Sequence, residues 1–264
     1  MNSSPEEKLL DLDRSLLKMG KVAVAFSGGV DSTFLLHCAS RILGADKVVA
    51  LQGVSCLIAK SAFDNAERII QTACDPGIVH RQIHLSPLDW DDFTANDEQR
   101  CYHCKRHLYQ IFQVERVQLG CSFLLDGTNV DDMNAVRPGL QAVRELAVRT
   151  PLVDAGLTKD EIRYFAKKAG LPNHDLPSDS CLATRIAIGK RIDSGELIKI
   201  ETGESFLRDL GFPGCRVKPS DGCVHLTIRE GDIQRFSTDT NRRSVQKGML
   251  ELGFGPVYLA IIGR

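Results

Sequence analysis

The sequence predicts an α/β protein in which a parallel, doubly wound sheet carries helices on both faces, followed by a small C-terminal α+β domain. Two observations lead to this fold class. Short, almost entirely apolar stretches alternate with longer helical patterns along the N-terminal part of the chain, as in parallel sheets buried on both faces. With 264 residues, 43% of them hydrophobic, the chain can also form a second, smaller core. We place the two domains at residues 1–175 and 176–264.

Local patterns predict the elements of the first domain in order. An apolar stripe from Leu9 to Met19 predicts an opening helix over residues 4–19, with Pro5 in its first turn. Apolar runs predict the strands, Gly44 ends one crossover helix, and Thr158 with Glu161 forms a capping box that starts another. The expected strands are 21–26, 47–52, 78–85 and 121–126, and the expected helices are 32–43, 60–73, 102–119 and 158–170.

The second domain is expected to begin after a linker. Pro172 and Pro177 interrupt residues 171–180, which are therefore expected to lack regular structure. A helical pattern follows over residues 193–210. Short strands are expected at 216–219, 225–229 and 258–262.

The composition argues against nucleic-acid and membrane partners. The formal net charge is -1 with the two signs interspersed, so the sequence indicates no basic face for phosphate backbones. No apolar run approaches the roughly 20 residues that span a bilayer, and the opening segment is charged rather than signal-like. Nine cysteines, an odd number, are typical of thiols that stay reduced. We therefore expect a soluble cytoplasmic protein that acts on a small molecule.

The first candidate site is the hexapeptide Ser27-Gly28-Gly29-Val30-Asp31-Ser32, between the first strand and its crossover helix. Backbone N–H groups and the helix dipole favour an anion at this position. The two glycines allow close backbone approach to phosphate oxygens, and Ser27 and Ser32 add hydroxyl donors. No lysine follows, so this is not a Walker loop. A tight strand-to-helix turn would explain the small residues but not the whole pattern.

A second polar segment follows the fourth strand of the same sheet. It contains Asp126-Gly127-Thr128-Asn129, then Asp131-Asp132, then Arg137-Pro138-Gly139. Ligands of parallel sheets bind at the carboxyl ends of the strands, where this segment begins. Asp132 is a candidate ligand of Mg²⁺, and Arg137 offers a forked cation for phosphate. The alternative is a polar turn with an asparagine cap.

Cysteines form the third group of candidates. Cys101 and Cys104 stand one helical turn apart beside Lys105, where a cation or the helix N-terminus lowers a thiol pKa. No second ligand pair follows at zinc spacing. Cys181 ends the linker, four residues before Arg185, which makes it a candidate activated thiolate. The remaining cysteines are either expected in apolar surroundings (Cys38, Cys56, Cys74 and Cys121) or carry no discriminating signal (Cys215 and Cys223).

The hexapeptide resembles the PP-loop of the ATP pyrophosphatases, which include synthetases of GMP, NAD and asparagine and several tRNA thiolases. This resemblance implies that the loop binds pyrophosphate, including through Val30, and that Asp31 helps to hold Mg²⁺. It further implies that ATP is split into AMP and pyrophosphate. AMP is attached to a carboxylate or amide oxygen, and a nucleophile then displaces it.

A closer resemblance adds the second polar segment, the run Cys181-Leu182-Ala183-Thr184-Arg185 and the helix end from Glu204 to Gly211. Together these look like the LarE group of ATP-dependent sulfur transferases, along nearly the whole chain. That group supplies sulfur for the nickel-pincer nucleotide cofactor. The resemblance implies adenylation of a pyridinium dicarboxylate mononucleotide and its conversion to a thiocarboxylate, with Gly127, Asn129 and Arg137 at ATP.

The same resemblance offers two sulfur sources. In the single-cysteine form, the residue at Cys181 attacks the acyl adenylate and loses its sulfur, which leaves dehydroalanine. Cys101, Cys104 and Cys181 together look like the three-cysteine form that holds a 4Fe-4S cluster, whose remaining iron takes up hydrosulfide from a sulfide donor.

For the small domain, the resemblance implies that Glu204, Arg216 and Lys218 line the substrate site and that the chain forms a homo-oligomer. It leads us to expect arginine where Lys218 stands, and lysine is a point charge rather than a fork. The exact acceptor therefore stays open. A tRNA thiolase, an ammonia-using synthetase and a non-catalytic ATP-binding regulator are the alternatives.

Overall fold

The computed structural model describes residues 3–134, 137–177 and 179–260. The chain divides into two compact units, Met1–Pro87 with Glu98–Asp179, and Leu88–Asp97 with Ser180–Arg264. A segment that the sequence analysis had assigned to the first domain, Leu88–Asp97, is thus grouped with the C-terminal unit. The predicted strand over residues 258–262 extends in part beyond the described residues.

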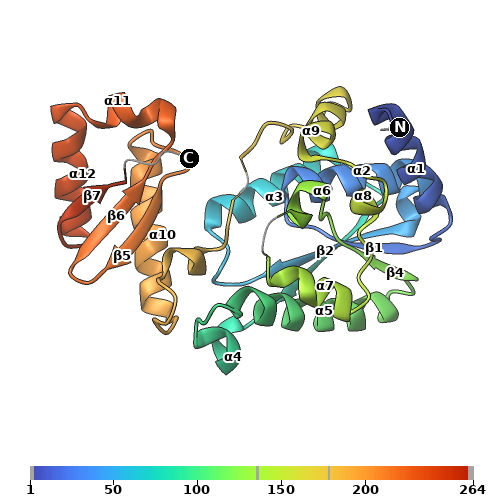
Figure 1. The fold of residues 1–264 in the computed structure, drawn as a ribbon, viewed down its shortest axis with the longest axis horizontal. Coiled ribbons are helices and arrows are strands. Elements are labelled where there is room, and N and C mark those ends of the chain that lie inside the picture. Colours follow the sequence, from blue (N-terminus) through green and yellow to red (C-terminus); the bar gives the residue numbers. More distant parts are fainter. Residues whose placement is uncertain (1–2, 135–136, 178, 261–264) are drawn as a thin grey trace. The chain divides into compact units, whose positions relative to one another are not determined.

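The larger unit contains the parallel sheet that the sequence predicts (Figure 1). Its order is β3-β2-β1-β4, and all pairs of neighbours are parallel. In register, Val22 of β1 lies beside Val48 of β2 and Phe123 of β4. The strands are β1 (Val22–Ala25), β2 (Val48–Val54), β3 (Val79–His84) and β4 (Phe123–Leu125).

Alternate residues of the strands enter cores on opposite faces of this sheet. Val22 and Val24 pack in one core with α1 and α2, whereas Ala23 packs in another with α5 and α7. A sheet buried on both faces requires strands without polar alternation, as this sequence has. The α-helices of the unit are α1 (Pro5–Leu17), α2 (Val30–Leu43), α3 (Lys60–Ala73), α5 (Arg100–Gln118), α6 (Val130–Met133), α7 (Gly139–Glu145), α8 (Pro151–Asp154) and α9 (Lys159–Lys168), with a 3₁₀ turn η1 at Ala45–Lys47.

The helix ends follow the predicted signals. Thr158 and Glu161 form the expected capping box at the start of α9, and Gly44 ends α2 with a φ of 89°. α2 differs from the prediction because it begins at Val30, which brings Asp31 and Ser32 into its first turn. The sequence analysis expected it to begin at Ser32.

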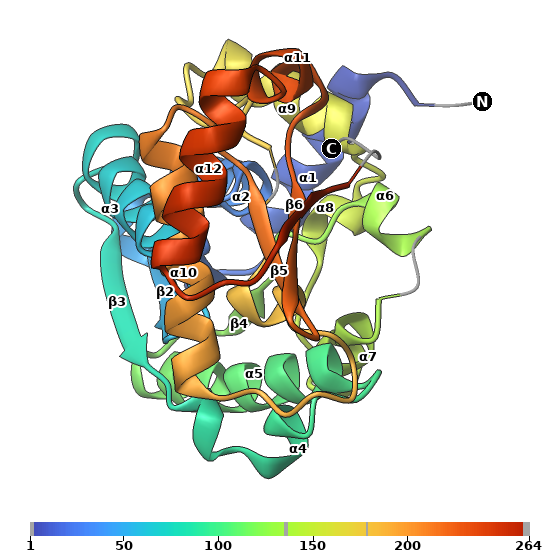
Figure 2. The ribbon, with the colours of Figure 1, turned by 90° about the vertical axis from the view of Figure 1, so that its left-hand side faces the viewer.

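The smaller unit is built around a mixed sheet of order β5-β6-β7, in which β5 and β6 are antiparallel and β6 and β7 parallel. One face packs in a core through Val217, Val224 and Leu226. The described elements, visible in Figure 2, are α4 (Asp91–Thr94), η3 (Leu182–Arg185), α10 (Ser194–Asp209), β5 (Arg216–Ser220), β6 (Cys223–Thr227), η4 (Glu230–Asp232), α11 (Ile233–Phe236), α12 (Asp239–Glu251) and β7 (Val257–Leu259), with η2 (Pro87–Asp89) at the division of the units.

Asn96 explains why Leu88–Asp97 belongs to this unit. Its buried side chain donates hydrogen bonds to the carbonyl oxygens of Ala187 and Lys190, at 2.8 and 2.6 Å. Its φ of 56° lies in the left-handed region that asparagine tolerates. These bonds join residues more than 90 positions apart, beyond the reach of local sequence patterns.

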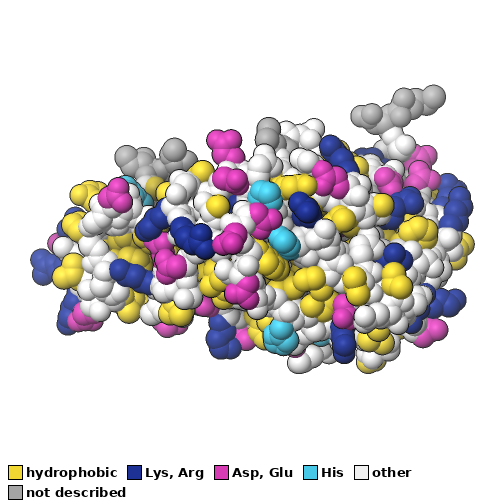
Figure 3. All heavy atoms as spheres, turned by 90° about the horizontal axis from the view of Figure 1, so that it is seen from below, with side chains coloured by type: hydrophobic (Ala, Val, Ile, Leu, Met, Phe, Trp, Pro, Cys, Tyr) yellow, Lys and Arg dark blue, Asp and Glu magenta, His cyan; other side chains and the backbone are white. Residues whose placement is uncertain are grey.

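The described surface mixes both charges. On the face drawn in Figure 3, Lys and Arg side chains are interspersed with Asp and Glu. None of the described helices combines the length and the apolar character needed to cross a bilayer.

Candidate functional site

The loop between β1 and α2 has a backbone that requires glycine. Gly28 has a φ of +75°, and a Cβ there would lie 2.6 Å from the Cβ of Ala66 in α3. Gly29 caps α2, and no side chain caps this helix. The first backbone N–H groups of α2 have no intrahelical acceptors. They are therefore available to an anion at the helix N-terminus.

The two serines of the loop have different positions. Ser32 is buried, and its hydroxyl donates to the Gly29 carbonyl at 3.0 Å and accepts from the Ser27 N–H at 3.3 Å. Ser27 is exposed, and its hydroxyl lies 3.2 Å from that of Ser32. Ser32 thus shapes the loop, while Ser27 presents a donor at its surface.

The second polar segment lies directly against this loop. A Cβ on Gly127 would meet the backbone nitrogen of Ser32 at 2.9 Å, so only glycine allows this approach. The Asn129 side-chain amide donates to Asp31 Oδ1 at 3.3 Å. The structure therefore brings together two segments that the sequence analysis predicted separately at the ends of β1 and β4.

Asn129 also connects the carboxylates that follow it. It is buried and caps α6, where its side-chain oxygen accepts the N–H groups of Asp131 and Asp132. Asp132 accepts the Asn129 N–H in return and forms an ion pair with Arg137 at 2.7 Å. Asp31, Asp132 and Arg137 thus belong to one polar network around Asn129.

Lys159 belongs to this site, although the sequence analysis did not assign it a role. Its ammonium lies 2.5 Å from Asp31 Oδ2, and its backbone N–H donates to Asp131 at 2.6 Å. Lys159 is the first residue of α9, directly after the cap Thr158. The capping box was the available signal, because it places a cation at a helix start facing the loop.

Asn173 is a second residue that the sequence analysis missed. Its buried side-chain amide donates to the Gly28 carbonyl and to the Thr33 hydroxyl, both at 2.9 Å. It therefore holds the loop and the start of α2 together. The prolines nearby indicated only a linker, so no sequence signal pointed to this contact.

Asp126 anchors the second segment to α5. Its carboxylate accepts hydrogen bonds from the Tyr109 hydroxyl and from the Thr128 backbone N–H, and Lys105 lies 3.3 Å away. Burial alone would raise the pKa of Asp126, but the Lys105 charge and the hydrogen bonds lower it overall. Burial, and then the Asp126 charge, raise the pKa of Tyr109 well above its usual value. Lys105, expected beside a thiol, thus pairs with Asp126.

Cys101 and Cys104 lie in the first turns of α5, the helix that carries Lys105. Cys101 is exposed and Cys104 is half-buried. Gly139 of α7 packs against this helix, because a Cβ on it would lie 3.2 Å from Lys105 and 3.5 Å from the Cys101 carbonyl. The Arg137-Pro138-Gly139 segment therefore reaches the turn that holds the cysteines.

Cys181 belongs to the smaller unit, where Arg185 organises its loop. The Arg185 guanidinium donates to the carbonyl oxygens of Ser180 and Cys181 at 2.7 and 3.0 Å. It also forms a buried bidentate pair with Glu204, at 2.8 and 3.1 Å. Glu204 accepts the Val217 N–H as well. The sequence analysis expected Arg185 in catalysis and Glu204 at substrate, but both are buried behind the half-buried Cys181.

Arg216 and Lys218 lie on the same face of β5, opposite the core residue Val217. Lys218 is exposed and lies beside His225 in the register of β5 and β6. Both cations are thus on the face of the small sheet that does not enter its core.

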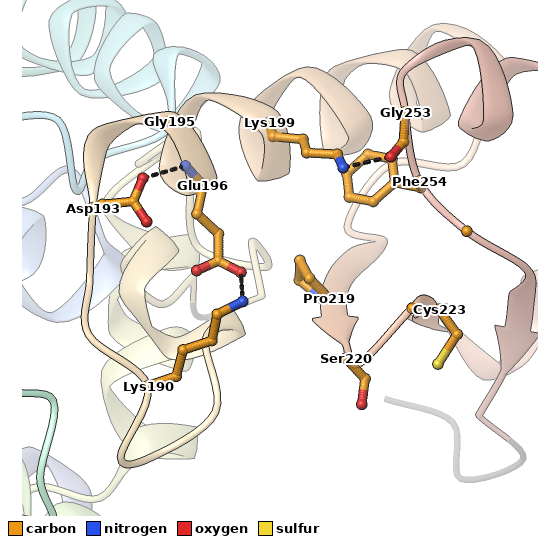
Figure 4. Close-up of a pocket in the computed structure, with 12 residues that line it drawn as sticks. Lys190, Asp193, Gly195, Glu196, Lys199, Pro219, Ser220, Cys223, Gly253 and Phe254 are labelled. Carbon is orange, nitrogen blue, oxygen red and sulfur yellow. Dashed lines mark hydrogen bonds and ion pairs between the residues drawn. The ribbon is translucent and has the colours of Figure 1, made fainter.

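The smaller unit also contains a cavity of about 410 Å³, to which the sequence analysis assigned no role (Figure 4). Lys190 forms an ion pair with Glu196 at 2.5 Å on one wall. Lys199 donates to the Gly253 carbonyl at 2.6 Å and lies 4.5 Å from the ring centre of Phe254. The lining residues are Lys190, Asp193, Gly195, Glu196, Lys199, Pro219, Ser220, Gly222, Cys223, Gly253, Phe254 and Gly255.

The donor sets of the two expected metal sites can be compared with these positions. Asp31 and Asp132 provide carboxylate oxygens within one network, which suits Mg²⁺. Cys101 and Cys104 provide soft thiol ligands that lie outside the apolar cores, which suits iron. Within the described ranges, no group of three or more His, Cys, Asp and Glu side chains is arranged to hold a metal ion.

Comparisons with known proteins agree with this fold and site. No family model matches the chain. It is 31% identical over 258 residues to an uncharacterized protein of Synechocystis, a match that covers 98% of this chain and 95% of that protein. It is 30% identical to the pyridinium-3,5-bisthiocarboxylic acid mononucleotide synthase of Lactiplantibacillus plantarum, over 97% of this chain and 91% of that synthase.

A more distant relative shares the nucleotide-binding part of the fold. The glutamine-hydrolyzing GMP synthase of Sulfurisphaera tokodaii has a polypeptide that is 23% identical, over 65% of this chain and 50% of that polypeptide. The near full-length match to the mononucleotide synthase shows the family, and this chain belongs to the LarE-type family of PP-loop proteins.

Proposed function

We propose that this chain is an ATP-dependent sulfur transferase that forms AMP and pyrophosphate. It adenylates a carboxylate of a pyridinium dicarboxylate mononucleotide and converts that carboxylate to a thiocarboxylate, a step toward the nickel-pincer nucleotide cofactor. In the first step a substrate carboxylate oxygen attacks the α-phosphorus of ATP, and pyrophosphate leaves. In the second step a sulfur nucleophile attacks the acyl carbon, and AMP leaves.

One observation carries the ATP-dependent part of the proposal. Gly127 and Asn129 contact the first turn of α2 at Ser32 and Asp31. Backbone donors, two carboxylates and two cations therefore meet at the carboxyl ends of neighbouring parallel strands. Nucleotides bind at this edge in doubly wound folds.

In this proposal each group of the site has a part in handling phosphate. The loop from Ser27 to Ser32 binds the pyrophosphate through backbone N–H groups and the Ser27 hydroxyl. Lys159 and Arg137 offset charge on the phosphate oxygens. Mg²⁺, held by Asp31 and Asp132, would neutralise the leaving pyrophosphate.

Sulfur transfer is assigned to the three cysteines. The Arg185–Glu204 pair holds the Cys181 loop in one conformation, through hydrogen bonds to its backbone. Arg185 and Glu204 are thus positioning residues in our proposal. Cys101, Cys104 and Cys181 would hold a 4Fe-4S cluster, which supplies an iron able to bind sulfide when present.

The acceptor is proposed from the family and from the charges of the small sheet. The name of the Lactiplantibacillus relative describes a pyridinium bisthiocarboxylic acid mononucleotide as its product. Arg216 and Lys218 offer two cations on one face of β5 for a carboxylate or phosphate. Lysine binds such groups as a point charge.

The test of the reaction combines ATP, Mg²⁺, a sulfide source and the pyridinium dicarboxylate mononucleotide under anaerobic conditions. We expect pyrophosphate release that depends on the mononucleotide, and a thiocarboxylate product by mass spectrometry. D31N should abolish both, whereas D46N, at a turn outside the site, should keep both. Pyrophosphate release without any thiocarboxylate would instead favour an ammonia-using synthetase.

The sulfur source is tested on anaerobically purified protein. We expect about four irons and four sulfides per chain. The variant C104A should lose them, and C56A, which removes an exposed cysteine elsewhere, should keep them. Metal-free protein whose mass decreases by one H₂S after turnover would identify Cys181 as the sacrificed sulfur donor.

A further inference from the structure

Cys223 differs from the other cysteines outside the proposed cluster. Burial raises the pKa of Cys38 and of Cys215 to about 12, and that of Cys74 to about 11. Such thiols stay protonated and react slowly as nucleophiles. Cys223 is half-buried at the start of β6, and its sulfur lies 3.7 Å from Nε2 of His225. The sequence analysis had no argument to separate Cys215 from Cys223, and the structure now separates them.

His225 is held in place beside the thiol. The two residues are two positions apart on a strand and therefore point to the same face of the sheet. The imidazole stacks on the ring of Tyr258 in β7, with ring centres 5.5 Å apart and an interplanar angle of 25°. An imidazole within hydrogen-bond reach of a thiol can take up its proton and leave a nucleophilic thiolate.

The surroundings of Cys223 can accommodate a small anion. Cys223 and its register partner Ser220 lie at one edge of the cavity described above (Figure 4). Lys190 and Lys199 bring ammonium groups to this cavity. On the open face of the sheet, Lys218 lies beside His225 in register. A donor that carries carboxylates would therefore be attracted to this part of the small unit.

We propose that Cys223 and His225 form a sulfur-loading site that takes sulfane sulfur from a small anionic persulfide. His225 takes the proton of the Cys223 thiol, and the thiolate attacks the terminal sulfur of the donor. A sulfur–sulfur bond forms at Cys223, and the sulfur–sulfur bond of the donor breaks. The donor leaves as a thiolate and takes the proton from His225, so Cys223 is oxidised to a persulfide and the donor is reduced to a thiol.

The use of this persulfide rests on the proposed function, because only a sulfur transferase consumes the sulfur. A metal site is a weaker interpretation of the same residues. Cys223 and His225 supply two ligands, whereas protein zinc sites use three or four. Within the described part of the chain, no third His, Cys, Asp or Glu completes such a group.

The experiment treats the reduced, full-length protein with glutathione persulfide and follows persulfide formation at each cysteine by peptide mass spectrometry. We expect Cys223 to be loaded about 100-fold faster than Cys56, an exposed cysteine without a described imidazole partner. H225Q should slow loading at Cys223 to the rate of Cys56 without changing Cys56 itself. The thermal midpoint of H225Q should match the wild type, because His225 is exposed.

Equal loading of Cys223 and Cys56 in the wild type, or unchanged loading in H225Q, would overturn the inference. Pyrophosphate release by the same wild-type preparation is measured separately. Loss of loading with intact pyrophosphate release would contradict only the sulfur-loading site. Loading at Cys223 without pyrophosphate release would contradict only the proposed function.

Discussion

The Lys159 ammonium lies 2.5 Å from the Asp31 carboxylate, although the two residues are 128 positions apart in the chain. This contact places a cation and an anion together at the first turn of α2. A phosphate-binding loop that splits ATP requires both, one for the phosphate oxygens and one for Mg²⁺. Lys159 is therefore the added residue that our account of the site tests first.

We predict that K159M lowers the rate of pyrophosphate release by about 100-fold to 1000-fold, as expected for loss of one charged donor from a transition state. K8M is the matched control, because it breaks the Lys8–Glu161 ion pair on the same helix α9. The rate for K8M should stay close to the wild type. Similar rates for K159M and K8M would remove Lys159 from the site.

The approach of Gly127 to Ser32 predicts that G127A is damaging. Its methyl group would lie 2.9 Å from a backbone nitrogen, which cannot move without displacing the first turn of α2. We expect a loss of about 1–3 kcal/mol in the free energy of unfolding, and weaker ATP binding. G231A, where a Cβ meets nothing within 4 Å, should change neither quantity. Normal ATP binding by G127A would show that the two segments do not form one site.

The buried pair of Arg185 and Glu204 predicts a large effect on stability. E204Q leaves the Arg185 charge without its carboxylate, which should cost about 3–5 kcal/mol of unfolding free energy in urea. The matched control D239N breaks an exposed pair with Arg242 and should cost less than about 1 kcal/mol. If E204Q kept full stability and raised only the KM for the mononucleotide, Glu204 would contact substrate instead.

The lowered pKa of Asp126 predicts an acid-dependent loss of stability. Because the folded pKa lies below the unfolded value of about 3.9, the ionised group stabilises the fold fully above that pH. This contribution is lost as the pH falls through the folded pKa. The free energy of unfolding of D126N should therefore fall less steeply in acid than that of the wild type. Parallel curves for the two proteins would contradict the proposed role of Lys105 and Tyr109.

Local patterns were sufficient for the parallel sheet and for the loop. The strands around Val22 and Val48 are continuous apolar runs, and two glycines between a strand and a helix carry their own geometric meaning. The meeting of Gly127 with the loop also follows from strand order, because β1 and β4 are neighbours. These features depend on few long-range contacts.

Contacts between distant residues could not be predicted in this way. Nothing near Asn173 in the sequence indicates that its amide binds the Gly28 carbonyl. Arg185 appeared to be a catalytic cation until its partner Glu204, 19 positions away, was located. The helix α12 (Asp239–Glu251) was not predicted, because its sequence is mostly polar and only a few of its residues, such as Val245 and Met249, are buried.

The central claim is that a substrate carboxylate oxygen is attached to AMP before sulfur arrives. It is tested most directly with a pyridinium dicarboxylate mononucleotide whose carboxylates carry a heavy oxygen isotope. Mass spectrometry of the AMP formed in a single turnover then reports where that oxygen goes. Our account predicts one labelled oxygen in AMP for each thiocarboxylate formed. Unlabelled AMP alongside a thiocarboxylate product would contradict adenylation of the carboxylate.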